Sequence, residues 1–327
     1  MRRTEIPIEG LRALAWAGDD LIDWIGGRRV RVDGTVLEFG VGDAYRFDGT
    51  AALRDVGATF ETLGTKGRLM RWNGRIREGN YVPLGFEEIR ELDRSYYCAK
   101  AYAYPLCVFE LPDGRPAIAH CPRVYDTLQI ELLDGTALTH RDAKSEDIFH
   151  ARLAASADGR WLLDNAWVWH PRSIVCVYDV ARALVEPEHL STSGLSLDFG
   201  EAFEGEVEAA TLSADRVVAS GDADCPMLSV AELPSGKNLA AIRLSERLGT
   251  RLMAWGPEHV VALDDHPRVV ALADGAIVHR WDDLDAGSRS QPSVSLEAPT
   301  GPYVAVDPLR PRFAVADARR IVVIEYD

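Results

Sequence analysis

The sequence predicts an all-β protein made of seven similar units, and three features support that prediction. One motif, an alternating apolar segment that ends in an acidic or amide residue and usually a glycine, occurs seven times in 327 residues. A strand that ends in Asp-Gly or Asn-Gly is a strong hairpin signal, because that turn needs residues that tolerate positive φ. The copies recur about every 47 residues, which indicates an array of one supersecondary unit. They lie at 30–34, 69–74, 129–135, 174–179, 228–232, 269–275 and 321–327.

The unit between Phe149 and Leu184 shows the strand pattern most clearly. It predicts three strands, at 149–156, 161–169 and 174–179, with turn residues between them. Val180 to Val185 would form a fourth, outer strand. Four short antiparallel strands in each repeat are typical of a propeller blade.

The segment from Ala155 to Leu163 reads Ala-Ser-Ala-Asp-Gly-Arg-Trp-Leu-Leu. It resembles the Ser-x-Asp-Gly-Arg/Lys-aromatic-apolar-apolar turn of WD40-like propeller repeats. The resemblance covers the whole chain at the level of period and strand pattern. It implies a seven-bladed propeller that serves as a scaffold, a fold that hosts unrelated functions.

The remaining units repeat this alternation in chain order. Leu11 to Phe39 contains four apolar segments, and the unit at 106–140 carries Leu-Pro-Asp-Gly-Arg at its first turn. We expect one propeller domain over residues 1–327, with blades at 11–39, 47–80, 105–141, 149–185, 205–244, 250–281 and 300–327.

Three insertions separate these units, at 81–104, 191–204 and 283–297. In the first, Phe86, Ile89 and Leu92 have helical spacing and predict a short amphipathic helix. Several tyrosines follow. A tyrosine-rich insertion on a rigid scaffold suits recognition, or it forms an ordered cover over a blade.

Ring closure is predicted from the two ends of the sequence. The seventh motif reaches Asp327, which leaves the last blade without a fourth strand, while Thr4 to Ile8 offers a spare strand before the first blade. We expect the N-terminal strand to complete the seventh blade, because an open ring would expose unpaired strand edges. The alternative is a frayed terminus.

Composition excludes several classes of function. The net charge of −15 argues against a general nucleic-acid binder and against an anionic membrane surface as partner. Five cysteines without a CxxC pair indicate reduced thiols in a cytoplasmic protein. The sequence contains no apparent signal peptide or membrane span, and no GxSxG, P-loop, GxGxxG or HExxH motif. We therefore predict no catalytic residue and no cofactor.

Arginines recur at or just before the third strand of six units. In a WD40-like blade the loop between strands two and three lies on the top face, beside the loops that join successive blades. Arg suits bidentate contacts with carboxylates, so the set predicts a cationic rim for an acidic protein partner. The alternative is that these residues only solubilise strand ends. They are Arg29, Arg68, Arg123, Arg172, Arg268 and Arg320.

The same loops carry Cys121, His170, Cys225 and His266, each followed by proline. Two cysteines and two histidines resemble a zinc ligand set. Equivalent loops fan around a ring, however, whereas zinc ligands must converge on one ion. Turn formation by proline is therefore the preferred interpretation, and no metal site is predicted.

Trp167, Trp169 and His170 form a second candidate partner site. The tryptophans either fill the space between blades or project as an apolar anchor. Packing in the core is the favoured role for Trp169, while both roles remain open for Trp167.

A third candidate is a cation site at the channel mouth, formed by Asp222, Asp264, Asp265 and Asp317. Calcium takes several oxygen ligands, and some propeller hydrolases use such a site. The alternative is that these acids are turn residues.

These observations favour a non-catalytic interaction or scaffolding subunit that binds another protein through the top face, as a monomer or within a hetero-complex. One alternative is a propeller hydrolase or lyase with a cation at the channel mouth. Another is a propeller that binds a small ligand or glycan.

Overall fold

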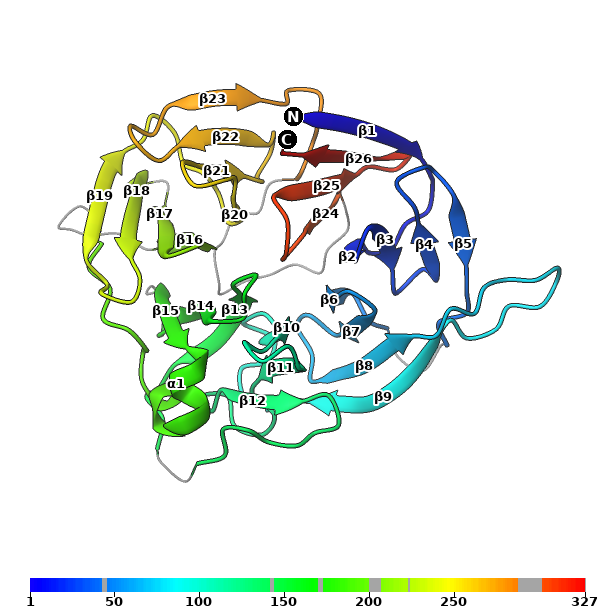
Figure 1. The fold of residues 1–327 in the computed structure, drawn as a ribbon, viewed down its shortest axis with the longest axis horizontal. Helices are drawn as coiled ribbons and strands as arrows, with labels where there is room; N and C mark the ends of the chain where they lie inside the picture. The colour runs from blue at the N-terminus through cyan, green and yellow to red at the C-terminus, as the bar shows by residue number, and fades with distance from the viewer. Residues whose placement is uncertain are drawn as a thin grey trace.

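Seven small antiparallel sheets stand as blades around a ring, as Figure 1 shows. The prediction of a seven-bladed, all-β propeller is thereby confirmed. The computed structural model describes residues 1–42, 46–141, 144–169, 173–199, 207–222, 224–287 and 302–326.

The first four blades run from the N-terminal side of the ring, each starting with its innermost strand. Blade 1 contains β2 (Ala15–Ala17), β3 (Asp20–Asp23), β4 (Arg28–Val30) and β5 (Val36–Glu38). Blade 2 contains β6 (Gly49–Leu53), β7 (Val56–Phe60), β8 (Lys66–Trp72) and β9 (Phe86–Asp93). Blade 3 has three strands, β10 (Leu106–Glu110), β11 (Pro116–His120) and β12 (Gln129–Leu132). Blade 4 also has three, β13 (Phe149–Ala155), β14 (Trp161–Trp167) and β15 (Ser173–Asp179).

The last three blades each have four strands. Blade 5 contains β16 (Val207–Ser213), β17 (Arg216–Gly221), β18 (Met227–Glu232) and β19 (Asn238–Arg243). Blade 6 contains β20 (Leu252–Ala254), β21 (His259–Ala262), β22 (Arg268–Ala271) and β23 (Ile277–Arg280). Blade 7 contains β24 (Tyr303–Val306), β25 (Arg312–Ala316), β26 (Arg320–Glu325) and, on the outside, β1 (Arg2–Pro7).

The core lies between the blades. Seven of the clusters of buried apolar side chains each draw on two adjacent blades, and together they run around the full circle. Between blades 1 and 2, for example, Trp24 packs with Met70 and Phe86. Alternate residues of a strand face opposite sides of its sheet, so each blade contributes to the cluster on either side. Stability therefore depends on every blade having two neighbours.

The N-terminal strand closes the ring, as predicted. β1 pairs antiparallel with β26 over six residues, from Arg2 opposite Glu325 to Pro7 opposite Arg320. Ile6 is 1% exposed and packs in the cluster between blades 7 and 1. The N-terminal segment is thus a structural strand rather than a frayed end.

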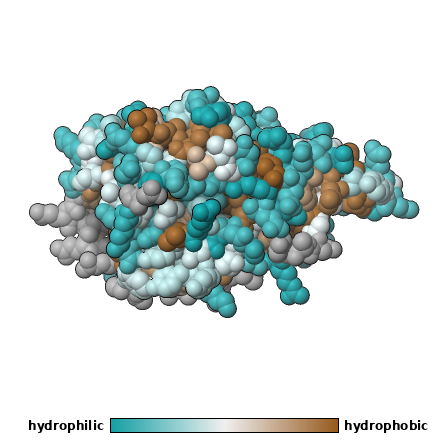
Figure 2. Space-filling view, turned by 90° about the horizontal axis from the view of Figure 1, so that it is seen from below, coloured by the Kyte–Doolittle hydropathy of each residue, from teal (hydrophilic) through white to brown (hydrophobic). Residues whose placement is uncertain are grey.

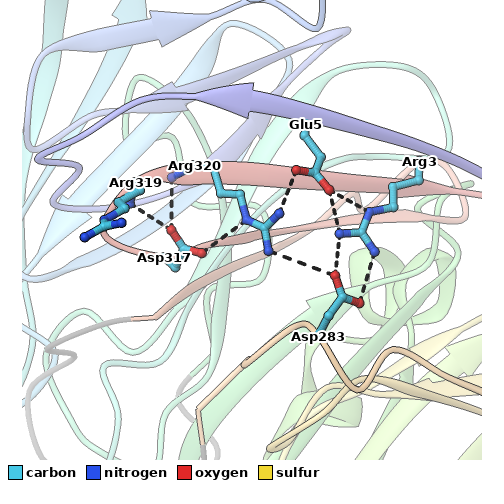
Figure 3. A network of polar contacts seen from close by, with 6 residues as sticks. All are labelled: Arg3, Glu5, Asp283, Asp317, Arg319 and Arg320. Carbon is cyan, nitrogen blue, oxygen red and sulfur yellow. Dashed lines mark hydrogen bonds and ion pairs between the residues drawn. The ribbon is translucent and has the colours of Figure 1, made fainter.

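Charged side chains fix this closure from outside (Figure 3). The Arg3 guanidinium donates to Asp283 at 2.6 Å and to Glu5 at 2.6 Å. Arg320 on β26 donates to Glu5 at 2.6 Å and lies 3.4 Å from Asp317. The network joins β1, β26 and the connection between blades 6 and 7, and it is exposed enough that solvent weakens each pair.

The outer element of blade 4 is not the predicted strand. Val180–Val185 is a short helix, α1, followed by the 3₁₀ helix η1 (Pro187–Ser191). Asp179 caps α1 by accepting a hydrogen bond from the Arg182 backbone N–H at 3.0 Å. Val180 and Ala183, three residues apart, are the buried side chains of the helix. Neither α1 nor η1, the helices among the described residues, has the length and apolar character needed to cross a membrane.

The predicted amphipathic helix at residues 86–92 is also wrong, because this segment is strand β9, the outer strand of blade 2. The register of β8 and β9 shifts between Leu69 and Met70. This bulge reverses the alternation of β9, so Phe86 and Leu92 pack in the clusters on opposite sides of the blade. The blade therefore extends beyond residue 80, where we expected its end.

The connection between β8 and β9 projects beyond the ring (Figure 1). In this hairpin Tyr81 is 70% exposed, and Val82 and Leu84 are also exposed. Figure 2 shows apolar side chains on the projection at its right. Its position away from the top-face loops makes it a useful control surface for the experiments below.

Thiol titration should separate the five cysteines into two groups. Cys107, Cys121 and Cys176 are buried, and burial raises the pKa of Cys107 to about 12. Cys98 and Cys225 are half-buried. In the native protein we expect only these two to react with a thiol reagent, because thiolate formation and access both control the rate. All five should react after denaturation without reductant; a lower total would reveal a disulfide and contradict the prediction of reduced thiols.

Candidate functional site

An aromatic cluster lies on the top face, where blades 2, 3 and 4 meet. Phe149, at the start of β13, is its centre, with ring centroids 4.5 Å from Tyr125 and 5.2 Å from Trp169. Tyr97 lies on the outside, with its ring tilted against Tyr125 at a centroid distance of 4.9 Å. The cluster comprises Tyr97, Tyr102, Tyr125, Phe149, Trp167 and Trp169.

The cluster has a buried base and an exposed upper side. Phe149 and Tyr102 are fully buried and Trp167 is 5% exposed. Trp169 is 45% exposed and Tyr97 is 42% exposed. Packing on the base holds the exposed rings in place, which suits them to present a preformed surface to a binding partner.

Asp147 lies at the edge of the cluster. Its carboxylate accepts hydrogen bonds from the Tyr125 hydroxyl at 2.6 Å and from the Trp169 indole N–H at 3.0 Å. The Tyr125 hydrogen bond, followed by the Trp169 bond, lowers the pKa of Asp147. The side chain therefore carries a negative charge, and among the described residues it forms no ion pair.

A buried histidine–aspartate pair supports the cluster from below. The His150 Nδ1 atom lies 2.6 Å from an Asp164 carboxylate oxygen, and the Ala151 backbone N–H donates to Asp164 at 3.1 Å. The other His150 nitrogen, Nε2, lies 3.3 Å from the Asp126 carbonyl oxygen. The pair thus links β13 and β14 to the loop that carries Tyr125.

Arg94 organises the tyrosine-rich connection between β9 and β10. Its buried guanidinium donates to carbonyl oxygens of the same connection, at 2.6 Å for Ala99 and 3.0 Å for Ala103, and to Gly64 of blade 2 at 2.6 Å. It also lies over the Tyr102 ring, 4.6 Å from the centroid. Burial lowers its pKa. Carbonyl groups and aromatic faces, rather than an acid, stabilise this cation.

A pocket of about 540 Å³ adjoins the exposed side of this connection. It lies between the β7–β8 loop and the β9–β10 connection, next to Tyr97. Its walls are Glu61, Leu63, Gly64, Thr65, Tyr96, Cys98, Ala99, Lys100 and Ala101.

Two residues of this region have left-handed backbone conformations. Cys98 has φ of 52° and Trp169 has φ of 50°. Side chains other than glycine, asparagine and aspartate adopt such values rarely, and the surrounding structure must impose them. At Trp169 the consequence is that the chain leaves β14 with the indole directed toward Asp147 and not into the blade.

The structure exposes Trp169, for which core packing was the favoured role, and buries Trp167, whose role the sequence left open. Trp167 is the last residue of β14 and belongs to the buried base, whereas Trp169 lies beyond the strand and is exposed. The alternation of a strand therefore stops between them. His170, the third residue of this predicted site, and Arg172 of the predicted rim lie outside the described residues.

Two arginines of the predicted rim are buried. Arg68 donates to the Val41 carbonyl oxygen at 3.0 Å and lies over the Phe86 ring. Arg268 donates to the Asp264 carbonyl oxygen at 3.0 Å and pairs with Glu246 at 2.9 Å. Each guanidinium group thus binds the connection that leads from the preceding blade into its own blade.

Two further arginines of the rim, Arg29 and Arg320, form ion pairs with acidic side chains of the chain itself. Arg29 donates to Asp20 at 2.7 Å, and Arg320 belongs to the closure network described above. Arg123 is exposed in the loop that also carries Tyr125. Among the rim arginines in the described part of the chain, Arg123 is the one that faces solvent and forms no ion pair with another described residue.

The four predicted cation ligands do not converge. Asp222 accepts hydrogen bonds from the Cys225 and Asp224 backbone N–H groups, and Asp317 caps the β25–β26 turn. Asp265 is exposed on the β21–β22 loop. These contacts match the turn interpretation.

Asp264, the remaining predicted ligand, is buried and shares the Arg247 guanidinium with Glu208, at 3.2 and 3.4 Å. Arginine therefore supplies the positive charge between these two acids. Within the described ranges, no group of three or more His, Cys, Asp or Glu side chains is placed to hold a metal ion.

Sequence reasoning noticed the tyrosine-rich segment but missed Arg94 and Asp147. A single arginine or aspartate in a connection carries no periodic signal. The signal that could have revealed this site was the concentration of aromatic residues, which occur in three separate loops on either side of residue 147.

Fold and closure together define a WD40-like seven-bladed β-propeller. The solved β-propeller domain of Cps50 (Swd1) from Myceliophteria thermophila is similar to this chain, with a TM-score of 0.52, 13% sequence identity and coverage of 99% of this chain and 100% of that one. At this identity the similarity concerns the fold alone. No protein-family model matches the sequence, and no curated protein matches it.

Proposed function

We propose that this chain is a non-catalytic interaction subunit that binds another protein through the top face of the propeller. The observation that carries the proposal is the aromatic cluster. Exposed Trp169 and Tyr97 stand on a buried base, and the Trp169 indole is held by Asp147. Tryptophan and tyrosine anchors held in place before binding are the residues that dominate protein interfaces.

The working surface in this proposal differs from the arginine rim. It consists of the exposed side of the aromatic cluster and the adjoining pocket. The odd number of cysteines supports a reducing compartment such as the cytoplasm. The subunit would act as a monomer or within a hetero-complex.

The proposal predicts that Trp169→Ala weakens partner binding by about 30-fold or more, the effect of losing one anchor residue. The partner is first isolated from the native host with the wild-type chain, and binding kinetics are then measured for each variant. Because the anchor is preformed, the dissociation rate should change most. Trp169→Ala should retain the wild-type melting curve, since the side chain is half exposed.

Tyr81→Ala provides the matched control, because Tyr81 is an exposed aromatic residue on the projecting hairpin. It should bind like the wild type. The proposal would be contradicted if the wild type and Trp169→Ala bound the partner with equal affinity, or if only Tyr81→Ala lost affinity. Either result would indicate that the partner binds elsewhere than at the cluster.

A small ligand is the second candidate, and the pocket beside Tyr96 favours it. Its volume of about 540 Å³ lies in the range of small-molecule sites. Of the predicted cationic rim, Arg123 is the described arginine that could still contact an acidic partner. Binding of glutamate and lysine peptides at the cluster distinguishes acidic from basic partners.

A further inference from the structure

We infer that the aromatic cluster and Asp147 together receive a positively charged side chain, lysine or arginine, of the protein partner. The inference rests on the proposed function and specifies the chemistry of the contact. It follows from the pairing of one carboxylate that has no ion-pair partner among the described residues with two exposed aromatic rings, Trp169 and Tyr97.

Asp147 is an acceptor that neutral groups hold in place. The Tyr125 hydroxyl and the Trp169 indole N–H each donate to a different oxygen of the carboxylate, at 2.6 and 3.0 Å. Neither donor brings a positive charge. Lys144 attracts the carboxylate only weakly and forms no ion pair with it among the described residues. A carboxylate has about four acceptor sites, so it can bind a further cationic donor.

The neighbouring rings provide the second half of the site. The ring centroids of Tyr97 and Tyr125 are 4.9 Å apart, and those of Trp167 and Trp169 are 5.7 Å apart. A cation is attracted when it lies within about 6 Å of an aromatic centroid, most strongly by tryptophan. An ammonium or guanidinium group that approaches Asp147 thus also meets the exposed parts of Trp169 and Tyr97. Their apolar surface would cover the methylene groups of the same side chain.

The overall charge favours the same type of partner. The chain carries a net charge of −15. Two further acids are sequence neighbours of the site, Asp126 next to Tyr125 and Glu146 next to Asp147. Such a field attracts basic partners and repels acidic ones. Arg123, exposed in the loop of Tyr125, is the group that opposes this preference.

The test uses the full chain and five blocked pentapeptides of glycine with a single central residue: lysine, trimethyl-lysine, arginine, norleucine or glutamate. The readout is the NMR resonance of the Trp169 indole N–H, assigned with Trp169→Phe, because this group donates directly to Asp147. We expect the lysine and arginine peptides to shift the resonance in a saturable way, with norleucine and glutamate much weaker. Lysine and trimethyl-lysine carry the same positive charge, but only lysine has N–H donors, so comparing them isolates the contribution of hydrogen bonding to Asp147.

Asp147→Asn should weaken binding of the lysine peptide by about tenfold or more, the cost of losing a charge-assisted hydrogen bond. Glu146→Gln is the matched control, since it removes the same charge one residue away; it should retain most of the affinity. The asparagine preserves the shape of the side chain, and an unchanged melting curve confirms the fold.

Three results would overturn the inference. They are equal binding of norleucine and lysine peptides, preferential binding of the glutamate peptide, and no response to lysine or arginine at millimolar concentration. None of them contradicts the proposed function, which is decided by Trp169→Ala and the isolated partner. Norleucine binding would indicate an apolar anchor site, and glutamate binding would favour the acidic partner.

Discussion

Arg94→Ala is expected to destabilise the protein by on the order of 3 kcal/mol and to abolish the top-face site. The guanidinium donates to the carbonyl oxygens of Gly64, Ala99 and Ala103, and the substitution would leave these buried groups without their donor. A hydrogen bond from a charged donor contributes about 1.5–3 kcal/mol, and several are lost together. The melting temperature should fall by about 6 °C or more, at ~2–4 °C per kcal/mol.

The same variant should release the Tyr96–Tyr97 segment. Hydrogen exchange of residues 94–105 should accelerate by more than that of the remaining blades, because the loss is local. Arg77→Ala is the control, since Arg77 forms an exposed ion pair with Glu38, and its melting temperature should stay close to that of the wild type. A melting curve of Arg94→Ala that matches the wild type would show that the connection is held by other contacts.

Deletion of residues 1–8 is expected to lower the melting temperature by roughly 10 °C or more. The deletion removes six residues of pairing with β26 and the buried Ile6, and it leaves the outer edge of blade 7 open. Because each blade needs two neighbours, the damage should spread to the cluster between blades 7 and 1. Thermal unfolding and limited proteolysis measure both effects.

Two point variants distinguish burial from charge in this closure. Ile6→Ala should reproduce a large part of the loss, about 2–5 kcal/mol, because the side chain is fully buried. Arg3→Ala should have a small effect that vanishes in high salt, since its partners are exposed. If the deletion leaves the melting curve unchanged, β1 does not hold the ring closed in solution.

The repeated motif predicted the propeller, and the spare strand before the first blade predicted its closure. Alternation with period two and Asp-Gly turns are local properties, and seven copies of one pattern leave few arrangements that bury every strand. The predictions of a helix at 86–92 and of a strand at 180–185 were wrong for different reasons. A bulge at β9 produced helical spacing in a strand, and the Asp179 cap favoured a helix where apolar residues suggested a strand.

The arginine positions show why the site was harder to predict. The sequence correctly places Arg68 and Arg268 near the start of third strands, but it does not determine the direction in which a long side chain points. In the structure both fold back onto carbonyl oxygens, where a planar guanidinium satisfies buried acceptors. Conversely, Asp147 and Trp169 meet only because loops of blades 3 and 4 converge, a tertiary relation that no spacing in the sequence records.

Closure by β1 also means that this strand remains unpaired while most of the chain is synthesised. β1 leaves the ribosome more than 300 residues before its partner β26, which corresponds to an interval on the order of tens of seconds. During that time its hydrogen-bonding edges are available to other chains. The strand reads Arg-Arg-Thr-Glu-Ile-Pro, with one side chain destined for the core and charged residues or proline at most other positions. Charges and proline discourage edge-to-edge association, so the composition of β1 protects the nascent chain until the ring can close.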